Sequence, residues 1–244
     1  MKSWLRMSAL TLFAAAIAAS AASAATETFR IDPNHTNVGF SIRHFFSKVN
    51  GRFKDFQGAI EFDARNPAAS SVDVTIQASS ITTENDRRDA DLRSPNFFEV
   101  DKYPTLTFKS TKVVLDADKT ALNPGDHLKV EGTLSMHGVE KPVTLDVTFL
   151  GMGAVGIAGN AMGTRAGFDA TATINRQDYG INWNKTLDQG GTMLGDDVTI
   201  TLNIEAGSMP GPKPMEVKPS DTSKPSESPK PTGKQPAPKG GGGK

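Results

Sequence analysis

Cysteine is absent from the 244 residues. This absence excludes disulfide bonds, thiolate metal sites, a cysteine nucleophile and the lipid-bearing cysteine of a bacterial lipoprotein. Histidine is scarce, and none of the four histidines forms an HxH or HxxxH pair, so we predict no metal site. A G-x-S-x-G motif is missing too, and no spacing singles out a catalytic triad. The protein must therefore be held together by apolar burial alone.

Long apolar runs are also missing, except at the N-terminus. Residues 1–24 have a basic start, an apolar stretch and the small-x-small pattern Ala22-Ser23-Ala24, which is typical of a cleaved secretory signal peptide. The stretch is short for a membrane span, so we expect no transmembrane segment in the mature chain. A buried N-terminal helix is the alternative. A signal peptide on a chain without cysteine favours the bacterial periplasm.

The C-terminal residues 207–244 are rich in lysine and proline, and four glycines precede the last lysine. Such a segment cannot bury enough surface to offset its ordering entropy, so we predict a disordered tail. Its seven lysines and three acidic residues give +4, the signal peptide carries +2 and the whole chain is neutral, which leaves −6 on residues 25–206. An acidic body argues against nucleic-acid binding. The tail is either a solubilising extension or a contact for anionic envelope components.

Residues 25–206 have the alternation of β-strands, with apolar side chains at every second position. Period two is typical of antiparallel sheet with one buried face. Two further stretches, 51–63 and 105–116, could each form a strand of ten or more residues, whereas residues 80–100 look helical or irregular. About eight long strands joined by short turns favour an up-and-down barrel over a sandwich. The six alternating stretches are 38–44, 72–78, 128–136, 143–149, 168–174 and 198–204.

The interior of an eight-stranded barrel is either filled by side chains or holds one small ligand. Gly132, Ala170 and Ala172 share the inward phase, and such small residues suit either a cavity or tight packing. Residues 88–108 turn from charged to aromatic. We expect them to cross the barrel mouth, with Phe97 and Phe98 in the opening and the arginines of residues 87–93 near the rim. An apolar interior with a cationic rim suits a long lipid with an anionic or polar head group.

The alternative for this segment is a barrel plugged by its own aromatics, with the arginines paired to Asp86, Asp89 and Asp91. Trp183 could line a cavity or belong to an ordinary core. The glycine-rich residues 151–167 lack the context of a nucleotide site, so we expect a hairpin there.

The four histidines differ in their positions relative to the strand pattern. His44 is in the inward phase at a strand end, where it could hydrogen-bond a quinone carbonyl, a phosphate oxygen or a neighbouring backbone carbonyl. His35 follows a Pro-Asn turn and is expected to brace it. His137, out of phase at a hairpin, and His127, at a strand start, are expected to be exposed.

Six motifs in order resemble the YceI-like family across essentially all of residues 27–206. The resemblance implies an extended lipocalin-like antiparallel barrel that binds a polyisoprenoid chain in the bacterial periplasm, with prenylated quinones and prenyl phosphates as ligand types. It brings no catalytic residues. Asp91 departs from the histidine usual in "RDxHLRS", which leaves the head-group preference open. The motifs are "IDPNHTNVGFSIRH" (31–44), "FKDFQGAIEFDARNPAASSVDVTI" (53–76), "RDADLRSPNFFEVDKYPTLTFKST" (88–111), "GTLSMHGVEKPVTLDV" (132–147), "RAGFDATATINRQDYGI" (165–181) and "LGDDVTITLNIEA" (194–206).

We therefore predict a carrier or storage protein for an isoprenoid lipid or quinone, with no other cofactor and no catalytic activity. A stress-related role is one option. An enzyme acting on a prenyl lipid and a structural, envelope-associated stress protein are the alternatives. Exposed strands at a barrel edge would favour a homodimer. The predicted lipid contacts are Phe40, Ile42, Phe53, Phe97, Phe98, Phe108, Met136, Ile174 and Trp183, and the predicted head-group contacts are His44, Arg88 and Arg93.

Overall fold

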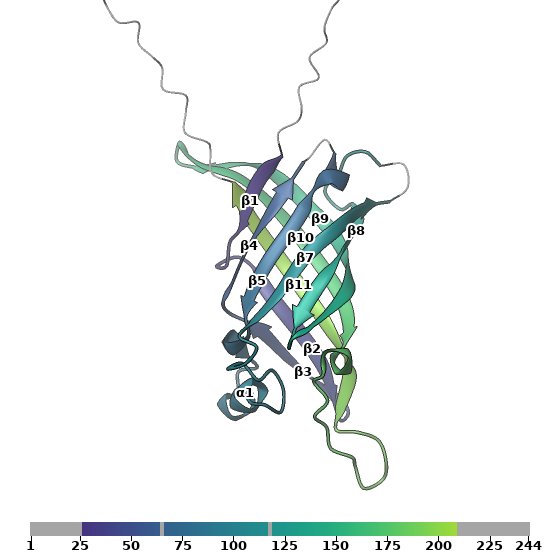
Figure 1. The fold of residues 1–244 in the computed structure, drawn as a ribbon. Helices are drawn as coiled ribbons and strands as arrows, with labels where there is room; N and C mark the ends of the chain where they lie inside the picture. Colours follow the sequence, from purple (N-terminus) through teal and green to yellow (C-terminus); the bar gives the residue numbers. More distant parts are fainter. Residues whose placement is uncertain (1–25, 64–65, 117–118, 209–244) are drawn as a thin grey trace, which may run out of the picture. The chain divides into compact units, whose positions relative to one another are not determined.

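The structure, a computed structural model, describes residues 26–63, 66–116 and 119–208. The predicted signal peptide lies outside these residues, as does the predicted tail from residue 209 onward. The chain divides into two units, 1–210 and 211–244, and all described residues belong to the first. The fold of this first unit is an antiparallel β-barrel (Figure 1).

The described residues form eleven strands, one α-helix and three short 3₁₀ helices. Every strand pairing in the sheet is antiparallel, as the alternating pattern predicts. The strands are β1 (Glu27–Ile31), β2 (Asn37–His44), β3 (Ser47–Phe53), β4 (Phe56–Phe62), β5 (Ser71–Gln77), β6 (Ile81–Thr82), β7 (Thr105–Leu115), β8 (His127–Met136), β9 (Val139–Ile157), β10 (Asn160–Asn175) and β11 (Leu194–Ser208), the α-helix is α1 (Asp86–Arg93), and the 3₁₀ helices are Pro67–Ala69, Ala78–Ser80 and Arg176–Tyr179.

The eleven strands make eight passes of the chain, because three passes are interrupted. β1 pairs with β11 and β4, and β4 pairs with β5. β2 pairs with β11 and β3, and β3 pairs with β6. The three interrupted passes are therefore β1 with β2, β3 with β4, and β5 with β6. The remaining strands are single passes, and the pairing of β1 with β11 closes the circle. The predicted closed barrel of about eight antiparallel strands is therefore confirmed.

The prediction of one continuous strand over residues 51–63 is wrong. β3 ends at Phe53 and β4 begins at Phe56, and both of these side chains are buried. Residues three apart on a continuous strand face opposite sides of the sheet. The chain must therefore break between them so that both phenylalanines face the interior. The strand predicted over 105–116 is confirmed as β7.

The ends of the barrel carry different elements. α1 lies at the lower end in Figure 1, where the β2–β3 hairpin and the segment between β10 and β11 also lie, whereas the long β9–β10 hairpin projects at the upper end. This hairpin confirms the prediction for residues 151–167. α1 begins where the Asn85 side chain accepts a hydrogen bond from the Arg88 backbone, and Arg93 lies in its last turn, as helix capping favours.

The predicted boundary between domain and tail is two residues too early. Gly207 and Ser208 continue β11 and pair with Arg165 and Thr164 of β10. Glycine and serine gave no alternating signal, but the neighbouring strand supplies backbone partners that hold them in the sheet.

Candidate functional site

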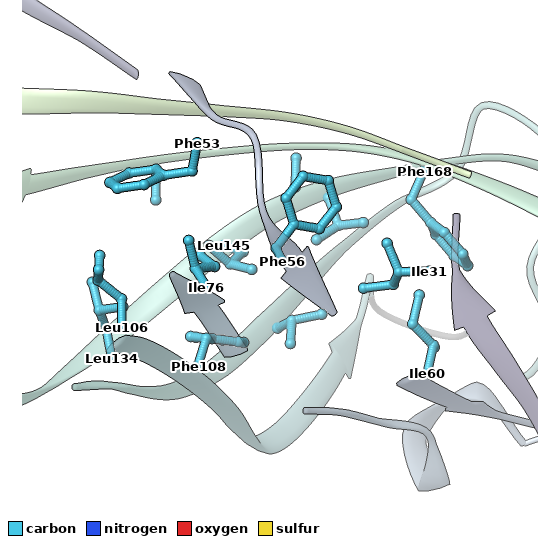
Figure 2. Packing of buried hydrophobic residues seen from close by; sticks show 14 of the residues in the cluster. Ile31, Phe53, Phe56, Ile60, Ile76, Leu106, Phe108, Leu134, Leu145 and Phe168 are labelled. Atoms are coloured by element: carbon cyan, nitrogen blue, oxygen red, sulfur yellow. The ribbon is translucent and has the colours of Figure 1, made fainter. Parts of the chain in front are cut away.

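A cavity of about 370 Å³ lies inside the barrel. Its walls come from both ends of the barrel, from Ile31 and Phe62 to Thr83 and Trp183. Figure 2 shows apolar side chains of several strands, Phe53, Phe108 and Phe168 among them, projecting into the space between the walls. The volume falls within the roughly 300–1,000 Å³ of small-molecule sites. The alternative of an interior filled by its own aromatics is therefore wrong.

All nine side chains predicted to contact a lipid line this cavity. They come from strands, from the segment after α1 and from the segment before β11. Phe97 and Trp183 meet at the α1 end, with ring centroids 5.2 Å apart, and Phe53 and Phe98 meet edge to face at 5.8 Å. The nine residues are Phe40, Ile42, Phe53, Phe97, Phe98, Phe108, Met136, Ile174 and Trp183.

Small inward residues act in two ways. Ala170 is buried and lines the cavity, so its short side chain leaves room for a guest. Gly132 does not line the cavity but lies under the ring of Phe108, which would collide with a Cβ at that position. One small residue thus widens the cavity, and the other lets a large side chain form its wall.

Polar groups gather at the α1 end of the cavity. Arg88 lines it and donates from Nε to Thr83 Oγ1 at 2.7 Å and from Nη2 to Thr83 O at 3.0 Å. Its Nη1 has no hydrogen-bond partner among the described residues. Asp91 also lines the cavity, and its Oδ1 accepts a hydrogen bond from Asn96 Nδ2 at 2.8 Å. This end therefore presents a cation and an anion one helical turn apart.

Asp89 positions Arg88 through Thr83. Asp89 is buried and accepts hydrogen bonds from Thr82 Oγ1 at 2.8 Å, from Thr83 N at 2.7 Å and from Thr83 Oγ1. Burial raises the pKa of Asp89, but the hydrogen bonds from Thr83 and Thr82 outweigh it and hold that pKa below its usual value. The carboxylate therefore stays charged and orients the hydroxyl that accepts from Arg88.

The alternative in which the α1 arginines pair with the α1 aspartates is wrong. No ion pair joins them among the described residues, because the carboxylate of Asp89 is turned toward Thr82 and Thr83. Arg93 donates from Nε to Ser79 O at 2.8 Å and from Nη2 to Ile81 O at 2.9 Å, and it does not line the cavity. Arg93 thus fastens α1 to the barrel, and its placement does not support the predicted head-group role.

His44 lines the cavity at the end of β2, in the inward phase predicted for it. Its ring packs edge to face on Phe45, with centroids 4.4 Å apart. Within the described part of the chain its ring nitrogens make no hydrogen bond, so the alternative of a bond to a neighbouring carbonyl is wrong. An imidazole without a protein partner can donate to or accept from a polar guest.

Arg176, which sequence reasoning missed, anchors the segment between β10 and β11 at the same end of the barrel. It is buried, lines the cavity and donates to Gly195 O at 2.9 Å, to Ile181 O at 2.7 Å and to Trp183 O at 2.9 Å. It also forms an ion pair with Asp196 at 2.9 Å. The only sequence signal was an arginine directly after an alternating strand.

Two of the other three histidines are where the sequence placed them. His35 braces its turn through a 3.1 Å contact with Asp32, and His127 is exposed. The prediction that His137 is exposed is wrong. Its backbone has a positive φ of 53°, so the turn redirects the ring onto Tyr103, and Nδ1 lies 2.9 Å from Tyr179 O.

Asp32, His35 and Glu205 form a group whose candidate ligand atoms lie within 4.8 Å of one another. Arg165 Nη1 is 3.2 Å from Asp32 and 3.6 Å from Glu205, so a guanidinium already balances the carboxylates. The hydrogen bonds from His35 and the Asn34 backbone lower the pKa of Asp32. This ion-pair group ties the turn between β1 and β2 to β10 and β11.

Among the described residues, no helix has the length and apolar character needed to cross a membrane.

Comparison with known proteins gives one consistent result. The family model of the YceI-like domain matches residues 29–206. Protein YceI of Shigella flexneri is 40% identical over 180 residues, which cover 72% of this chain and 88% of the relative. The YCEI protein of Campylobacter jejuni aligns with a TM-score of 0.55 at 32% identity, over 73% of this chain and 96% of its own.

A third protein resembles the fold alone. It is a polyisoprenoid binding domain from Saccharophagus degradans implicated in plant cell wall breakdown, with a TM-score of 0.53 and 18% identity. The alignment covers 75% of this chain and 99% of that domain. At this identity the likeness supports the barrel architecture only.

Proposed function

The chain belongs to the YceI-like family, and from its hollow barrel we propose that it binds one long isoprenoid lipid as a carrier or storage protein. The observation that carries the proposal is a cavity with an almost wholly apolar wall whose ionisable side chains, His44, Arg88, Asp91 and Arg176, lie at the α1 end. This distribution fits a hydrocarbon chain with a polar head group. The polyisoprenoid binding named for the Saccharophagus degradans domain points the same way.

Apolar burial can supply the affinity without catalytic groups. Each buried five-carbon unit contributes about 3–4 kcal/mol, at roughly 0.8 kcal/mol per CH₂. A few units therefore reach useful affinity after the cost of association. The length and shape of the cavity would then select the chain, and the groups at the α1 end would select between a quinone and a prenyl phosphate.

We place this activity in the bacterial periplasm, on the strength of the signal-like residues 1–24 and the lack of cysteine. We propose no catalytic role. Asp89, the α1 carboxylate that an enzyme could have used, is engaged with Thr82 and Thr83 and does not line the cavity.

Native mass spectrometry of the protein recovered from cells tests the proposal. We expect an adduct with the mass of a prenyl quinone or prenyl phosphate. The variant Ala170→Trp fills the cavity and should lose the adduct, whereas Thr171→Trp, on the exposed face of the same strand, should keep it. A protein that carries no lipid and takes up neither ligand class when offered it would refute the proposal.

A further inference from the structure

Two exposed phenylalanines form the tip of the β2–β3 hairpin. Phe46 is fully exposed at 106%, and Phe45 is 38% exposed. The other exposed large apolar residues within the described ranges lie on the β9–β10 hairpin, which projects at the opposite end of the barrel (Figure 1). Contiguous exposed apolar surface with a polar rim marks sites of interaction with proteins or membranes.

The backbone of this tip shows that folding alone does not favour the two aromatics. His44 pairs with Ser47, so Phe45 and Phe46 form a two-residue hairpin turn, and Phe45 has a positive φ of 49°. Such turns favour glycine, asparagine or aspartate, and a bulky residue with positive φ is an outlier. The tip therefore combines backbone strain with exposed aromatic surface, and neither stabilises the barrel.

The tip is held in place rather than left loose. Phe45 N donates to Met193 O at 2.9 Å, across to the segment before β11. Arg43 donates from Nη1 to Phe45 O at 3.2 Å and to Thr192 O at 3.4 Å. These bonds fix the turn from two sides and present the Phe46 ring outward.

The hairpin is also cationic, within a domain that is acidic overall. Residues 37–53 contain Arg43, Lys48 and Arg52 and no acidic residue, whereas residues 25–206 together carry −6. Arg52 is paired with Glu84, which leaves Arg43 and Lys48, cross-strand partners, directly beside the tip. Exposed aromatics flanked by cations are typical of segments that lie in the interface of an anionic bilayer.

The tip stands beside the cavity. His44 immediately precedes Phe45 and lines the cavity, as does Met193, which holds the Phe45 backbone. We propose that Phe45 and Phe46 insert into the interfacial region of an anionic phospholipid bilayer and hold this end of the barrel against it. The purpose of this contact, transfer of a lipid between bilayer and cavity, rests on the proposed function, but the contact itself can be tested without any isoprenoid.

Sedimentation of the purified protein with vesicles of phosphatidylethanolamine and phosphatidylglycerol (3:1) tests the contact. The double variant Phe45→Ser, Phe46→Ser should bind about tenfold more weakly or worse, because the apolar surface that enters the bilayer is lost. The matched control Ile157→Ser, Met162→Ser removes exposed apolar residues from the opposite hairpin and should bind like the unaltered protein. All variants keep the lysine-rich tail, so its contribution to binding cancels.

A second pair of variants tests whether the positive charge beside the tip contributes to vesicle binding. Lys48→Glu should weaken binding to these vesicles about fivefold or more, as expected for a cation near an anionic surface. Lys112→Glu, an exposed position near the far end of β7, should leave binding unchanged. Equal losses in the two variants would contradict a contact at the tip.

A depth measurement keeps the proposal falsifiable if the serine variant does not fold. The fluorescence of Phe46→Trp should be quenched by brominated acyl chains, whereas that of Ile157→Trp should not. Absence of quenching at residue 46 overturns the proposal. A dimer that Phe46→Ser dissociates, without vesicle binding, also overturns it, because a second copy would then cover the tip.

Failure of this contact and failure of the proposed function are distinguishable. Uptake of a prenyl quinone from detergent reports on the cavity alone, and the double serine variant should retain it. A protein that binds vesicles but takes up no lipid from detergent contradicts the proposed function and leaves the contact standing. The reverse result contradicts only the contact.

Discussion

The ring of Phe108 on β7 lies over Gly132 on β8, its diagonal neighbour across the two strands. A Cβ at residue 132 would lie 2.4 Å from Cζ of that ring and 2.7 Å from Lys109 O, and this backbone oxygen can yield only if the sheet moves. We expect Gly132→Ala to lower the free energy of unfolding by about 1–3 kcal/mol, measured by urea denaturation.

Gly153 provides the control for this prediction. A Cβ at Gly153 meets no atom within 4 Å, and its φ lies outside the left-handed range. Gly153→Ala should therefore leave stability unchanged or slightly higher, because alanine restricts the unfolded chain. Equal stability of the two variants would show that the barrel wall yields at Phe108.

Asp89 should make the stability of the barrel depend on pH in the acid range. Its folded-state pKa lies below the usual value, so its charged form contributes stability above the unfolded-state pKa of about 4 and loses that contribution as pH falls through the folded-state pKa. We expect Asp89→Asn to be less stable by about 1–3 kcal/mol at neutral pH. The difference from the unaltered protein should shrink below about pH 4.

Asp86, exposed in the first turn of the same helix, is the control. Asp86→Asn should show only the small loss expected for a charge near a helix N-terminus, and no comparable change in the acid dependence. If both variants follow the same stability profile from pH 3 to pH 7, the buried carboxylate is not the group responsible.

Replacement of Tyr179 by phenylalanine should stabilise the folded protein. Its side chain is 1% exposed, and its hydroxyl is buried without a hydrogen-bond partner among the described residues. We expect Tyr179→Phe to raise the free energy of unfolding by about 1 kcal/mol, because an unsatisfied polar group is removed from the interior. A loss of stability in thermal denaturation would instead reveal a partner for the hydroxyl, such as a buried water.

Deprotonation of Tyr179 should be detectable at alkaline pH. Burial, aided by the charge of Asp178, raises the pKa of Tyr179 to about 12. Since tyrosine in an unfolded chain deprotonates near pH 10, deprotonation of Tyr179 favours the unfolded chain, and the free energy of unfolding should fall between about pH 10 and 12. Tyr179→Phe should therefore remove a step near pH 12 from the ultraviolet titration.

The apolar part of the site could be predicted from the sequence because the period of a strand fixes which side chains face inward. Phe40 and Ile42 share one phase on β2, and both line the cavity. The interruption between Phe53 and Phe56 could not be foreseen. The residues on each side of it alternate regularly when taken alone, and only closure of the barrel requires both phenylalanines to face the interior.

The polar part was harder to predict, because its geometry is set by backbone groups that no pattern reveals. Arg88 and Arg93 look equivalent in the sequence. Arg88, however, donates a hydrogen bond to Thr83 and lines the cavity, whereas Arg93 donates to the carbonyl oxygens of residues 79 and 81 and does not line it. Arg176 was missed for a similar reason, since three of its acceptors are main-chain oxygens, those of Ile181, Trp183 and Gly195.

Arg88 and Asp91 should set the head-group preference of the cavity in opposite directions. Both line its α1 end, so an anionic head group placed there gains from the guanidinium and is opposed by the carboxylate. We expect Asp91→Asn to raise the affinity for a prenyl phosphate about fivefold to tenfold, on the basis of a charge interaction of about 1 kcal/mol or more. Affinity for a neutral prenyl quinone of the same chain length should change little.

Removal of the positive charge at residue 88 should have the opposite effect. Arg88→Gln should weaken prenyl phosphate binding and spare the quinone, whereas Arg87→Gln, exposed on α1 and absent from the cavity wall, should affect neither ligand. Competition between the two ligands in native mass spectrometry gives the preference directly. If Asp91→Asn and Arg88→Gln shift it in the same direction, or if both leave it unchanged, the head group does not lie at the α1 end, and the lipid must bind with its polar end elsewhere in the barrel.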